Sequence, residues 1–139
     1  MIVVDTNILV HLYFPSEFTE FSEKLFLKDP AWIAPYLWRS EFRNVLLGFV
    51  RKNIIDFPKA IAAIEKAESQ MFGHEHAVSS MLVLELARGS GCTAYDCEFV
   101  ALGKAKETFF VTWEKKLTKT FPEIAISPKA FLEKPLRKH

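Results

Sequence analysis

The sequence predicts an α/β domain built on a mainly parallel sheet. Two observations lead to this fold class. Short runs such as Ile2-Val3-Val4 are apolar at every position, which is typical of strands buried on both faces of a parallel sheet. These runs alternate with longer segments of helical periodicity, as in chains of β-α-β units. At 139 residues the chain has the length of about one domain.

The first half of the chain is expected to hold two strands and four helices. Asp29-Pro30 ends the second helix and Pro35 breaks the second strand, because proline restricts the preceding residue and lacks a backbone donor. Apolar residues recur at helical spacing between these breaks. The predicted strands are 2–4 and 32–34, and the predicted helices are 6–14, 17–27, 36–51 and about 58–71.

The second half is expected to continue the alternation. Residues 73–76 are predicted to form a turn, and residues 78–88, apolar almost all round, a buried helix that Gly89-Ser90-Gly91 terminates. Further on we expect helices at 96–106 and 113–120, strands at 108–112 and 124–126, and a final helical turn that begins at Ser127-Pro128. The predicted domain spans 1–133, and residues 134–139 form a short basic tail.

The composition is that of an ordered globular protein. Half of the residues are apolar, and the net charge is +1. Strong attraction of the whole molecule to nucleic acid is therefore not expected, although this net charge is compatible with local basic patches. No apolar stretch approaches the roughly 20 residues that a membrane helix needs, and the chain begins without a charged leader, so we expect a cytoplasmic protein. Cys92 and Cys97 are then expected to be reduced thiols, with a zinc pair as the alternative.

Two acidic residues directly follow predicted strands. Asp5 ends the first strand, and Glu114 follows the strand at 108–112. Because parallel strands end at the same edge of a sheet, we expect these side chains to lie close together. Each also has a structural interpretation: Asp5 as the N-cap of the next helix, and Glu114 as an acid in a first helical turn.

Glu41 lies on the apolar face of the helix at 36–51. Apolar residues lie four and three positions before it, and four and eight positions after it: Leu37, Trp38, Val45 and Phe49. A buried carboxylate needs a cation or hydrogen-bond donors, because leaving it unpaired costs several kcal/mol. The structural alternative to a functional role is a salt bridge with Arg39 or Arg43. Neither arginine is three or four residues from Glu41, so the helix itself does not supply this pairing.

Asp96 begins the helix at 96–106. Thr93 lies three residues earlier, and this spacing resembles a capping box with Asp in place of Glu or Gln, so Asp96 also has a structural interpretation. Glu98 is interpreted as an acid that points elsewhere and favours the helix dipole.

Together these acids would form a cluster beside the sheet edge. Like charges repel one another and shift their own pKa values unless a cation lies among them. Oxygen ligands of this kind suit Mg²⁺ or Mn²⁺ better than Zn²⁺, and such ions orient water and neutralise phosphate charge. The residues therefore point to phosphodiester chemistry.

The ordered set of these residues resembles the PIN-domain family, and within it the VapC-type ribonuclease toxins. The resemblance covers essentially the whole chain: VVDTNIL at the start, Glu41 on a helix after a short strand, TAYDCEFVALGKA and FFVTWEKKL. It implies a small, mainly parallel sheet flanked by helices, in three layers α/β/α. It also implies an acidic Mg²⁺ or Mn²⁺ site with two supporting polar groups. The acids are Asp5, Glu41, Asp96 and Glu114, and the supporting residues are Asn7 and Thr112.

The resemblance implies a metal-dependent endoribonuclease that hydrolyses RNA phosphodiester bonds, as the toxin of a VapBC-type toxin-antitoxin pair. Its expected partners are RNA, a cognate antitoxin protein and a second copy of the chain in a homodimer, with no membrane. Five basic residues are candidates for phosphate contacts, with a solvated surface as the alternative: Arg43, Lys104, Lys106, Lys115 and Lys116. The alternative function is an RNA-binding or RNA-processing PIN module with weak or no toxin activity.

The sequence departs from the family pattern at the fourth acid. Where the family usually has Thr, a small or polar residue and Asp, this chain has Thr112-Trp113-Glu114. The extra methylene lengthens the reach of Glu114, and we expect the bulky Trp113 to crowd the entrance. His74-Glu75-His76 lacks the spacing of helical zinc ligands and is interpreted as an exposed turn rather than a metal site.

Overall fold

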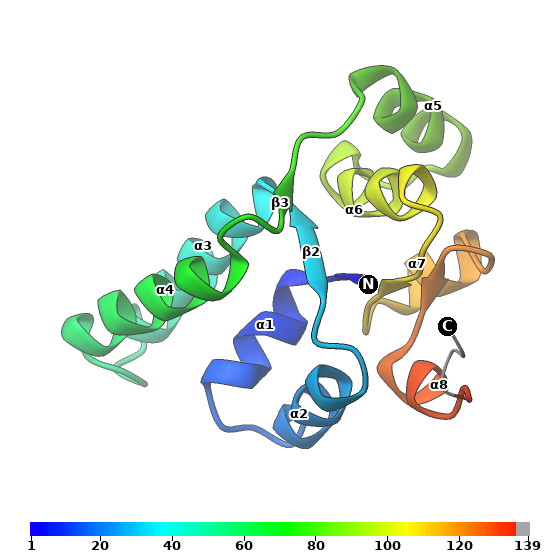
Figure 1. Cartoon of the computed structure of the whole chain (residues 1–139). Helices are drawn as coiled ribbons and strands as arrows, with labels where there is room; N and C mark the ends of the chain where they lie inside the picture. Colours follow the sequence, from blue (N-terminus) through cyan, green and yellow to red (C-terminus); the bar gives the residue numbers. More distant parts are fainter. Residues whose placement is uncertain (136–139) are drawn as a thin grey trace.

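Five short strands form one parallel sheet in the order β3-β2-β1-β4-β5 (Figure 1). The computed structural model describes residues 1–135. The strands are β1 (Ile2–Val4), β2 (Trp32–Pro35), β3 (Glu75–His76), β4 (Phe110–Val111) and β5 (Ala125–Ile126). The central strand β1 pairs in parallel with β2, and it pairs with β4 through Val4 and Val111. All residues of these three strands are buried, as expected when a parallel sheet is covered on both faces.

Helices cover both faces of the sheet, so the domain has the three layers α/β/α that the sequence predicted. On one face α6 contacts β1, β2 and β4, and α5 packs against the outside of α6. The other group contains α1 to α4, of which α3 and α4 contact β2 (Figure 1). The helices are α1 (Thr6–Tyr13), α2 (Thr19–Lys28), α3 (Leu37–Arg51), α4 (Phe57–Met71), α5 (Ser80–Ser90), α6 (Ala94–Ala105), α7 (Lys115–Thr120) and α8 (Pro128–Leu132).

Large apolar side chains from both helical layers and from the sheet fill the core. The fully buried ones include Trp32, Trp38, Phe42, Phe99 and Phe110. The close approach of α6 to the sheet depends on Gly103. A Cβ atom at Gly103 would stand 3.0 Å from Ile124 Cγ2 and 3.2 Å from the Thr108 carbonyl oxygen, so a larger residue would push the neighbours apart.

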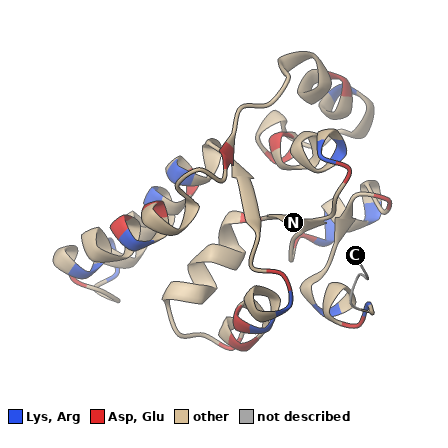
Figure 2. Ribbon diagram, viewed as in Figure 1, with Lys and Arg blue, Asp and Glu red and all other residues tan. Residues whose placement is uncertain are grey.

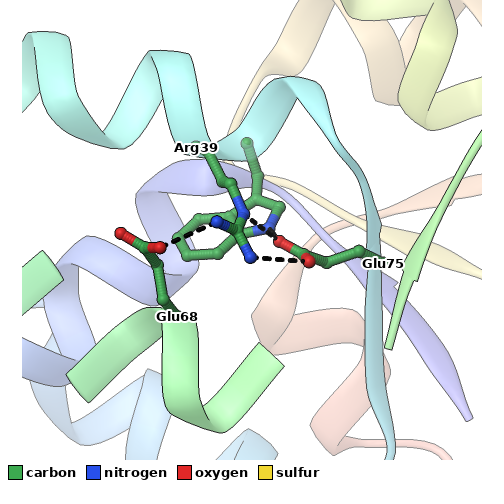
Figure 3. A network of polar contacts seen from close by, with 4 residues as sticks. Arg39, Glu68 and Glu75 are labelled. Carbon is green, nitrogen blue, oxygen red and sulfur yellow. Dashed lines mark hydrogen bonds and ion pairs between the residues drawn. The ribbon is translucent and has the colours of Figure 1, made fainter. Parts of the chain in front are cut away.

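Strand β3 is an element that the sequence analysis missed, because an exposed turn was predicted for 73–76. Glu75 is instead held by two residues of α3. Its Oε1 accepts hydrogen bonds from Trp38 Nε1 at 2.7 Å and Arg39 Nε at 2.5 Å, and its Oε2 accepts one from Arg39 Nη2 at 2.9 Å. Arg39 Nη1 also donates to Glu68 Oε2 at 2.7 Å (Figure 3). This network joins α3, α4 and β3, and it leaves the Glu75 side chain only 6% exposed.

Helix α5 lies at the surface, which contradicts the prediction of a buried helix at 78–88. Val83 is its one buried residue, whereas Met81 is 70% exposed and Leu84 is 63% exposed. Because α5 packs mainly against α6, only one stripe of the helix is covered. The helix ends at Gly91, whose φ of 73° lies in the left-handed region that favours glycine.

Other boundaries differ from the prediction by a few residues. Strand β4 is shorter than the predicted 108–112, α7 begins later than 113, and Pro35 belongs to β2 instead of ending it. Both cysteines are buried free thiols. Part of the predicted basic tail, residues 136–139, lies outside the described residues. Within residues 1–135, no helix is long and apolar enough to cross a membrane.

Candidate functional site

The central pairing of the sheet brings Asp5 and Thr112 side by side. They follow β1 and β4, which run parallel with Val4 opposite Val111. The backbone N–H of Asp5 donates to the Val111 carbonyl at 3.0 Å. Thr112 is fully buried and donates from Oγ1 to Asp5 Oδ2 at 2.6 Å. The two strand ends therefore meet at one edge of the sheet.

The Asp5 carboxylate is held in place and resists ionisation. Its Oδ1 accepts a hydrogen bond from the Thr6 backbone N–H at 2.8 Å, which confirms that Asp5 is the N-cap of α1. Burial raises the pKa of Asp5 to about 6, although hydrogen bonds from Thr112 and Thr6 act in the opposite direction. The charges of Asp96 and Glu114 raise the pKa of Asp5 further. Capping and membership of an acidic cluster therefore coexist in one residue.

Glu41 projects from α3 toward the same edge. Its Oε1 accepts a hydrogen bond from Thr6 Oγ1 at 2.8 Å. Burial raises the pKa of Glu41, and the charges of Asp5, Asp96 and Glu98 raise it further, while the bond from Thr6 opposes them. Within residues 1–135 no salt bridge involves Glu41.

The two arginines considered as partners of Glu41 are engaged elsewhere or exposed. Arg39 pairs with Glu68 and Glu75. Arg43 is exposed and lines an apolar groove between α3 and α4. The structure therefore provides a hydroxyl donor for Glu41 and not the salt bridge that was the alternative interpretation.

Asp96 lies in the first turn of α6, near both of these acids. Its backbone N–H donates to the side-chain Oγ1 of the N-cap residue Thr93 at 3.0 Å, which is one half of the predicted capping box. Its carboxylate raises the pKa of Asp5 and the pKa of Glu41. Asp96 is thus both a first-turn acid and a member of the cluster.

Glu98 is a fifth acid that the sequence analysis set aside. Burial raises the pKa of Glu98, and its charge raises the pKa of Glu41. Spacing along the helix carried no signal for this proximity, because residues two apart point to different sides of a helix. Only the tertiary fold, which places α6 and α3 around the same sheet, brings Glu98 near Glu41.

The fourth predicted acid, Glu114, is the N-cap of α7, but its side chain makes no capping hydrogen bond. It is exposed, and its charge raises the pKa of Asp5. The Glu114 backbone N–H donates to Thr112 Oγ1 at 3.0 Å, so the hydroxyl that donates to Asp5 also fixes the backbone of Glu114. Thr112 therefore links the first and fourth acids.

The Trp113 ring packs against helix α2. Its centroid lies 4.9 Å from that of Phe18 and 5.1 Å from that of Phe21. Its Nε1 is buried without a hydrogen-bond partner among the described residues. This aromatic cluster holds the segment between Thr112 and α7 against α2.

Thr6 is the functional candidate that the sequence analysis missed. The motif Asp5-Thr6-Asn7 directed attention to Asn7, which is exposed, and no hydrogen bond of its side chain is found within residues 1–135. Thr6 is 4% exposed and donates to both Asp5 and Glu41, from different atoms. One signal in the sequence could have identified Thr6. It follows Asp5, which already caps the helix, so the Thr6 hydroxyl is not needed as a cap.

The candidate RNA-binding residues are exposed but do not form one patch. Lys115 and Lys116 directly follow Glu114 at the start of α7. Lys104 and Lys106 lie at the far end of α6, Lys104 about 12 Å from Asp96 along the helix axis. Lys and Arg residues are spread over helices of both layers (Figure 2).

The donor set fits a hard divalent cation. Asp5, Glu41, Asp96 and Glu114 offer only oxygen atoms, and no Lys or Arg forms a salt bridge with any of them within residues 1–135. A cation among them would replace mutual repulsion by attraction. As arranged in the described chain, no three acidic, histidine or cysteine side chains stand close enough to hold an ion. The four acids border one edge of the sheet without converging on a point.

Comparison with known proteins shows the fold. No family model and no curated protein matches the chain. Among solved structures, the chain is similar to the crystal structure of PAE2754 from Pyrobaculum aerophilum, with a TM-score of 0.72 and 20% sequence identity. The similarity covers 94% of this chain and 92% of that chain, so the α/β/α arrangement is shared over nearly the whole length of both.

Proposed function

We propose that this chain is a Mg²⁺- or Mn²⁺-dependent endoribonuclease of the PIN-domain kind, and the toxin of a VapBC-type toxin-antitoxin pair. One observation supports it most: Asp5 and Glu41, both with raised pKa values, lie beside Asp96 with no paired Lys or Arg within residues 1–135. Desolvated like charges destabilise a fold, so their presence without a protein cation favours a metal site over a structural role. The motifs that resemble the PIN-domain family direct the choice to RNA.

Each acid has a role in this proposal. Asp5 and Asp96 would hold the metal ion, and a bound ion would supply neutralisation of the phosphate charge and activation of water. Glu41 orients the attacking water, and burial and the neighbouring acids raise its pKa, which makes it a better proton acceptor than an ordinary glutamate. Glu114 is exposed, so it completes the site directly or through a water molecule. Thr112 holds Asp5 through the bond from Oγ1 to Oδ2.

The partners follow from the same proposal. Lys115 and Lys116 are exposed beside Glu114 and are the first candidates for RNA phosphate contacts. Lys104, Lys106 and Arg43 would contact a longer stretch of RNA, because they lie on other parts of the surface. A cognate antitoxin and a homodimer belong to the proposal through the family resemblance.

The decisive experiment is cleavage of a defined RNA pool by the purified chain and by Asp96→Asn, with and without Mn²⁺. We expect metal-dependent cleavage by the wild type and loss of cleavage in Asp96→Asn, because Asn keeps the shape of the side chain and loses the charge. Circular dichroism checks that the variant is folded. Glu85→Gln, an exposed change on α5, is the matched control and should cleave normally.

Two results would contradict the proposal. Retained metal-dependent cleavage by Asp96→Asn would remove Asp96 from the metal site. Binding of RNA by the wild type without any cleavage, at all metal concentrations, would favour the alternative of an RNA-binding module with no nuclease activity.

A further inference from the structure

Thr6 is bonded to two of the four acids at once. Its backbone N–H donates to Asp5 Oδ1 at 2.8 Å, and its Oγ1 donates to Glu41 Oε1 at 2.8 Å. The residue is 4% exposed, and Thr6 and Thr112 are two of the three buried polar residues in the described chain. The two acids that Thr6 contacts, Asp5 directly after β1 and Glu41 on α3, are 36 positions apart in the sequence.

Local structure gives no reason for a hydroxyl at this position. Asp5 already caps α1, so the side chain of Thr6 is not needed as a cap. As the first residue of the helix, Thr6 also has no earlier helical carbonyl to which its hydroxyl could donate. Threonine is moreover a poorer helix former than alanine, because its branched side chain loses rotamer freedom. The buried hydroxyl finds its partner in tertiary structure, on Glu41.

The bond to Glu41 constrains the direction of the carboxylate. The Glu41 side chain can rotate about two bonds beyond its Cβ atom. Burial alone therefore does not determine which carboxylate oxygen points to the acidic cluster. With Oε1 occupied by the Thr6 hydroxyl, Oε2 accepts no hydrogen bond within residues 1–135 and remains available. The Asp5 carboxylate is held at both oxygens, by Thr112 Oγ1 at Oδ2 and by the Thr6 backbone N–H at Oδ1.

We propose that Thr6 is a positioning residue that orients Glu41 relative to Asp5, so that both carboxylates face the same metal ion. The inference rests on the proposed function, and it adds a second threonine to the supporting role that Thr112 has toward Asp5. Donors behind metal-binding carboxylates typically change metal affinity or activity by about 10-fold to 100-fold when they are removed.

The test compares Thr6→Val, which keeps the shape and removes the hydroxyl, with Thr6→Ser, which keeps the hydroxyl. Mn²⁺ affinity is measured by calorimetry, and cleavage of a defined RNA is measured as kcat and KM. Thr6→Val should weaken Mn²⁺ binding and lower kcat by about 10-fold or more, with little change in KM. Thr6→Ser should stay within about 2-fold of the wild type. Thr6→Ala, which favours the helix, provides the same loss of hydroxyl if Thr6→Val folds poorly.

Thr19→Val is the matched control, because it removes a threonine hydroxyl that donates to the Phe14 carbonyl, and it should leave Mn²⁺ binding unchanged. Suppose that the wild type binds Mn²⁺ and cleaves RNA, and that Thr6→Val and Thr6→Ala match it in both measurements. This result would overturn the role of Thr6 and leave the proposed function intact. Loss of Mn²⁺ binding in Thr6→Ser as large as in Thr6→Val would overturn it as well. A wild type that neither binds Mn²⁺ nor cleaves would overturn both this inference and the proposed function.

Discussion

The Asp5 carboxylate accepts hydrogen bonds from Thr6 and Thr112, yet it binds its proton more tightly than a free aspartate does. Hydrogen bonds to a carboxylate favour the charged form, whereas burial and nearby negative charges favour the neutral form. At Asp5 burial outweighs the two donors, and Asp96 and Glu114 add to its effect. Ionisation of Asp5 is therefore unfavourable in the folded protein, and a cation bound beside it would make ionisation more favourable.

The raised pKa of Asp5 predicts how the stability of the metal-free protein changes with pH. The folded state binds this proton more tightly than the unfolded chain, so the stabilisation is complete below pH 3.8 and is lost as the pH rises through about 6. At neutral pH the ionised Asp5 lowers the free energy of unfolding by on the order of 3 kcal/mol. Asp5→Asn should remove this loss, so its urea midpoint should exceed that of the wild type at pH 7.5 in EDTA.

The comparison at pH 4 supplies the internal control, because there Asp5 is protonated in the folded wild type and the two proteins should differ little. Glu85→Gln controls for the loss of an exposed acid. Equal midpoints of Asp5→Asn and wild type at pH 7.5 would show that Asp5 is not destabilising in the metal-free protein.

Glu114 is where the chain departs from the family pattern, and two interpretations of it predict opposite signs. As an acid that only favours the dipole of α7, Glu114 should stabilise the fold, and Glu114→Gln should lower the melting temperature slightly. As a weak or water-mediated ligand beside Asp5, it should repel the other acids. We expect Glu114→Gln to raise the melting temperature without metal, and to weaken Mn²⁺ binding and slow cleavage at limiting Mg²⁺.

Glu114→Asp restores the usual family residue and completes this comparison. Faster cleavage would mean that the longer side chain is a handicap, and slower cleavage would mean that the backbone fixed by Thr112 suits Glu. Cleavage by Glu114→Gln at the full wild-type rate in limiting Mg²⁺ would exclude Glu114 from the site.

At the scale of elements, one ionic network fixes the edge of the sheet. Strand β3 contains only Glu75 and His76, too few residues to hold an edge by backbone pairing alone. Arg39 on α3 binds Glu75 through two nitrogen atoms and binds Glu68 on α4 through a third. The side chain of Glu75 thus attaches β3 to the helical layer (Figure 3).

Removal of Arg39 should therefore destabilise the protein strongly. Arg39→Met leaves the carboxylate of Glu75, whose side chain is 6% exposed, without a cation, and we expect a loss of about 2–3 kcal/mol in urea unfolding. Glu68→Gln is the matched control, because it keeps the pair with Glu75 and removes only the more exposed partner, and it should cost less than about 1 kcal/mol.

The difference in the free energy of unfolding between wild type and Arg39→Met should change with pH in a definite direction. The bond from Arg39 lowers the pKa of Glu75, so its stabilisation is present above the usual pKa of glutamate and is lost as the pH falls below it. The gap between wild type and Arg39→Met should accordingly narrow in acid. Equal losses for Arg39→Met and Glu68→Gln at pH 7 would refute the special role of the buried pair.

At the scale of the whole molecule, positive and negative charges nearly balance, so the strongest electrostatic effect is local, at the acidic cluster. The net charge of +1 gives the chain little overall attraction for anions, and basic residues are spread over both helical layers (Figure 2). An ion bound among the acids would change both the local charge and the stability of the fold. A ligand that binds only the folded state raises the free energy of unfolding by RT ln(1 + [L]/Kd).

Mn²⁺ should therefore raise the melting temperature. At ten times its Kd the gain is about 1.4 kcal/mol, which corresponds to roughly 4 °C for a domain of this size. The measurement is a thermal melt in EDTA and in Mn²⁺ at constant ionic strength, with Asp96→Asn as the control that should show a much smaller shift. The absence of any shift for the wild type at millimolar Mn²⁺ would count against the metal site.

Much of the fold could be predicted because its signals are local. The apolar strands Ile2–Val4 and Phe110–Val111 and the cap at Asp5 depend on residues adjacent in sequence. Helix α5 was predicted wrongly because an all-round apolar pattern indicates a potential for burial and does not say which element will cover it. Strand β3 was missed because its residues are held by pairing with β2 and by Arg39 on α3, both of which are distant in the sequence.

By itself the sequence determined the alternation of strands and helices, the parallel sheet, and the acids that follow its strands, because each depends on local periodicity and on the direction of a strand. Only the tertiary structure decided which polar groups meet. The Thr6 hydroxyl found Glu41, Glu98 came near the same carboxylate, and Arg39 turned to Glu75 and away from the acidic cluster. These contacts join elements distant along the chain, and their geometry is set by how α3 and α6 pack around the sheet, which spacing within one helix does not encode.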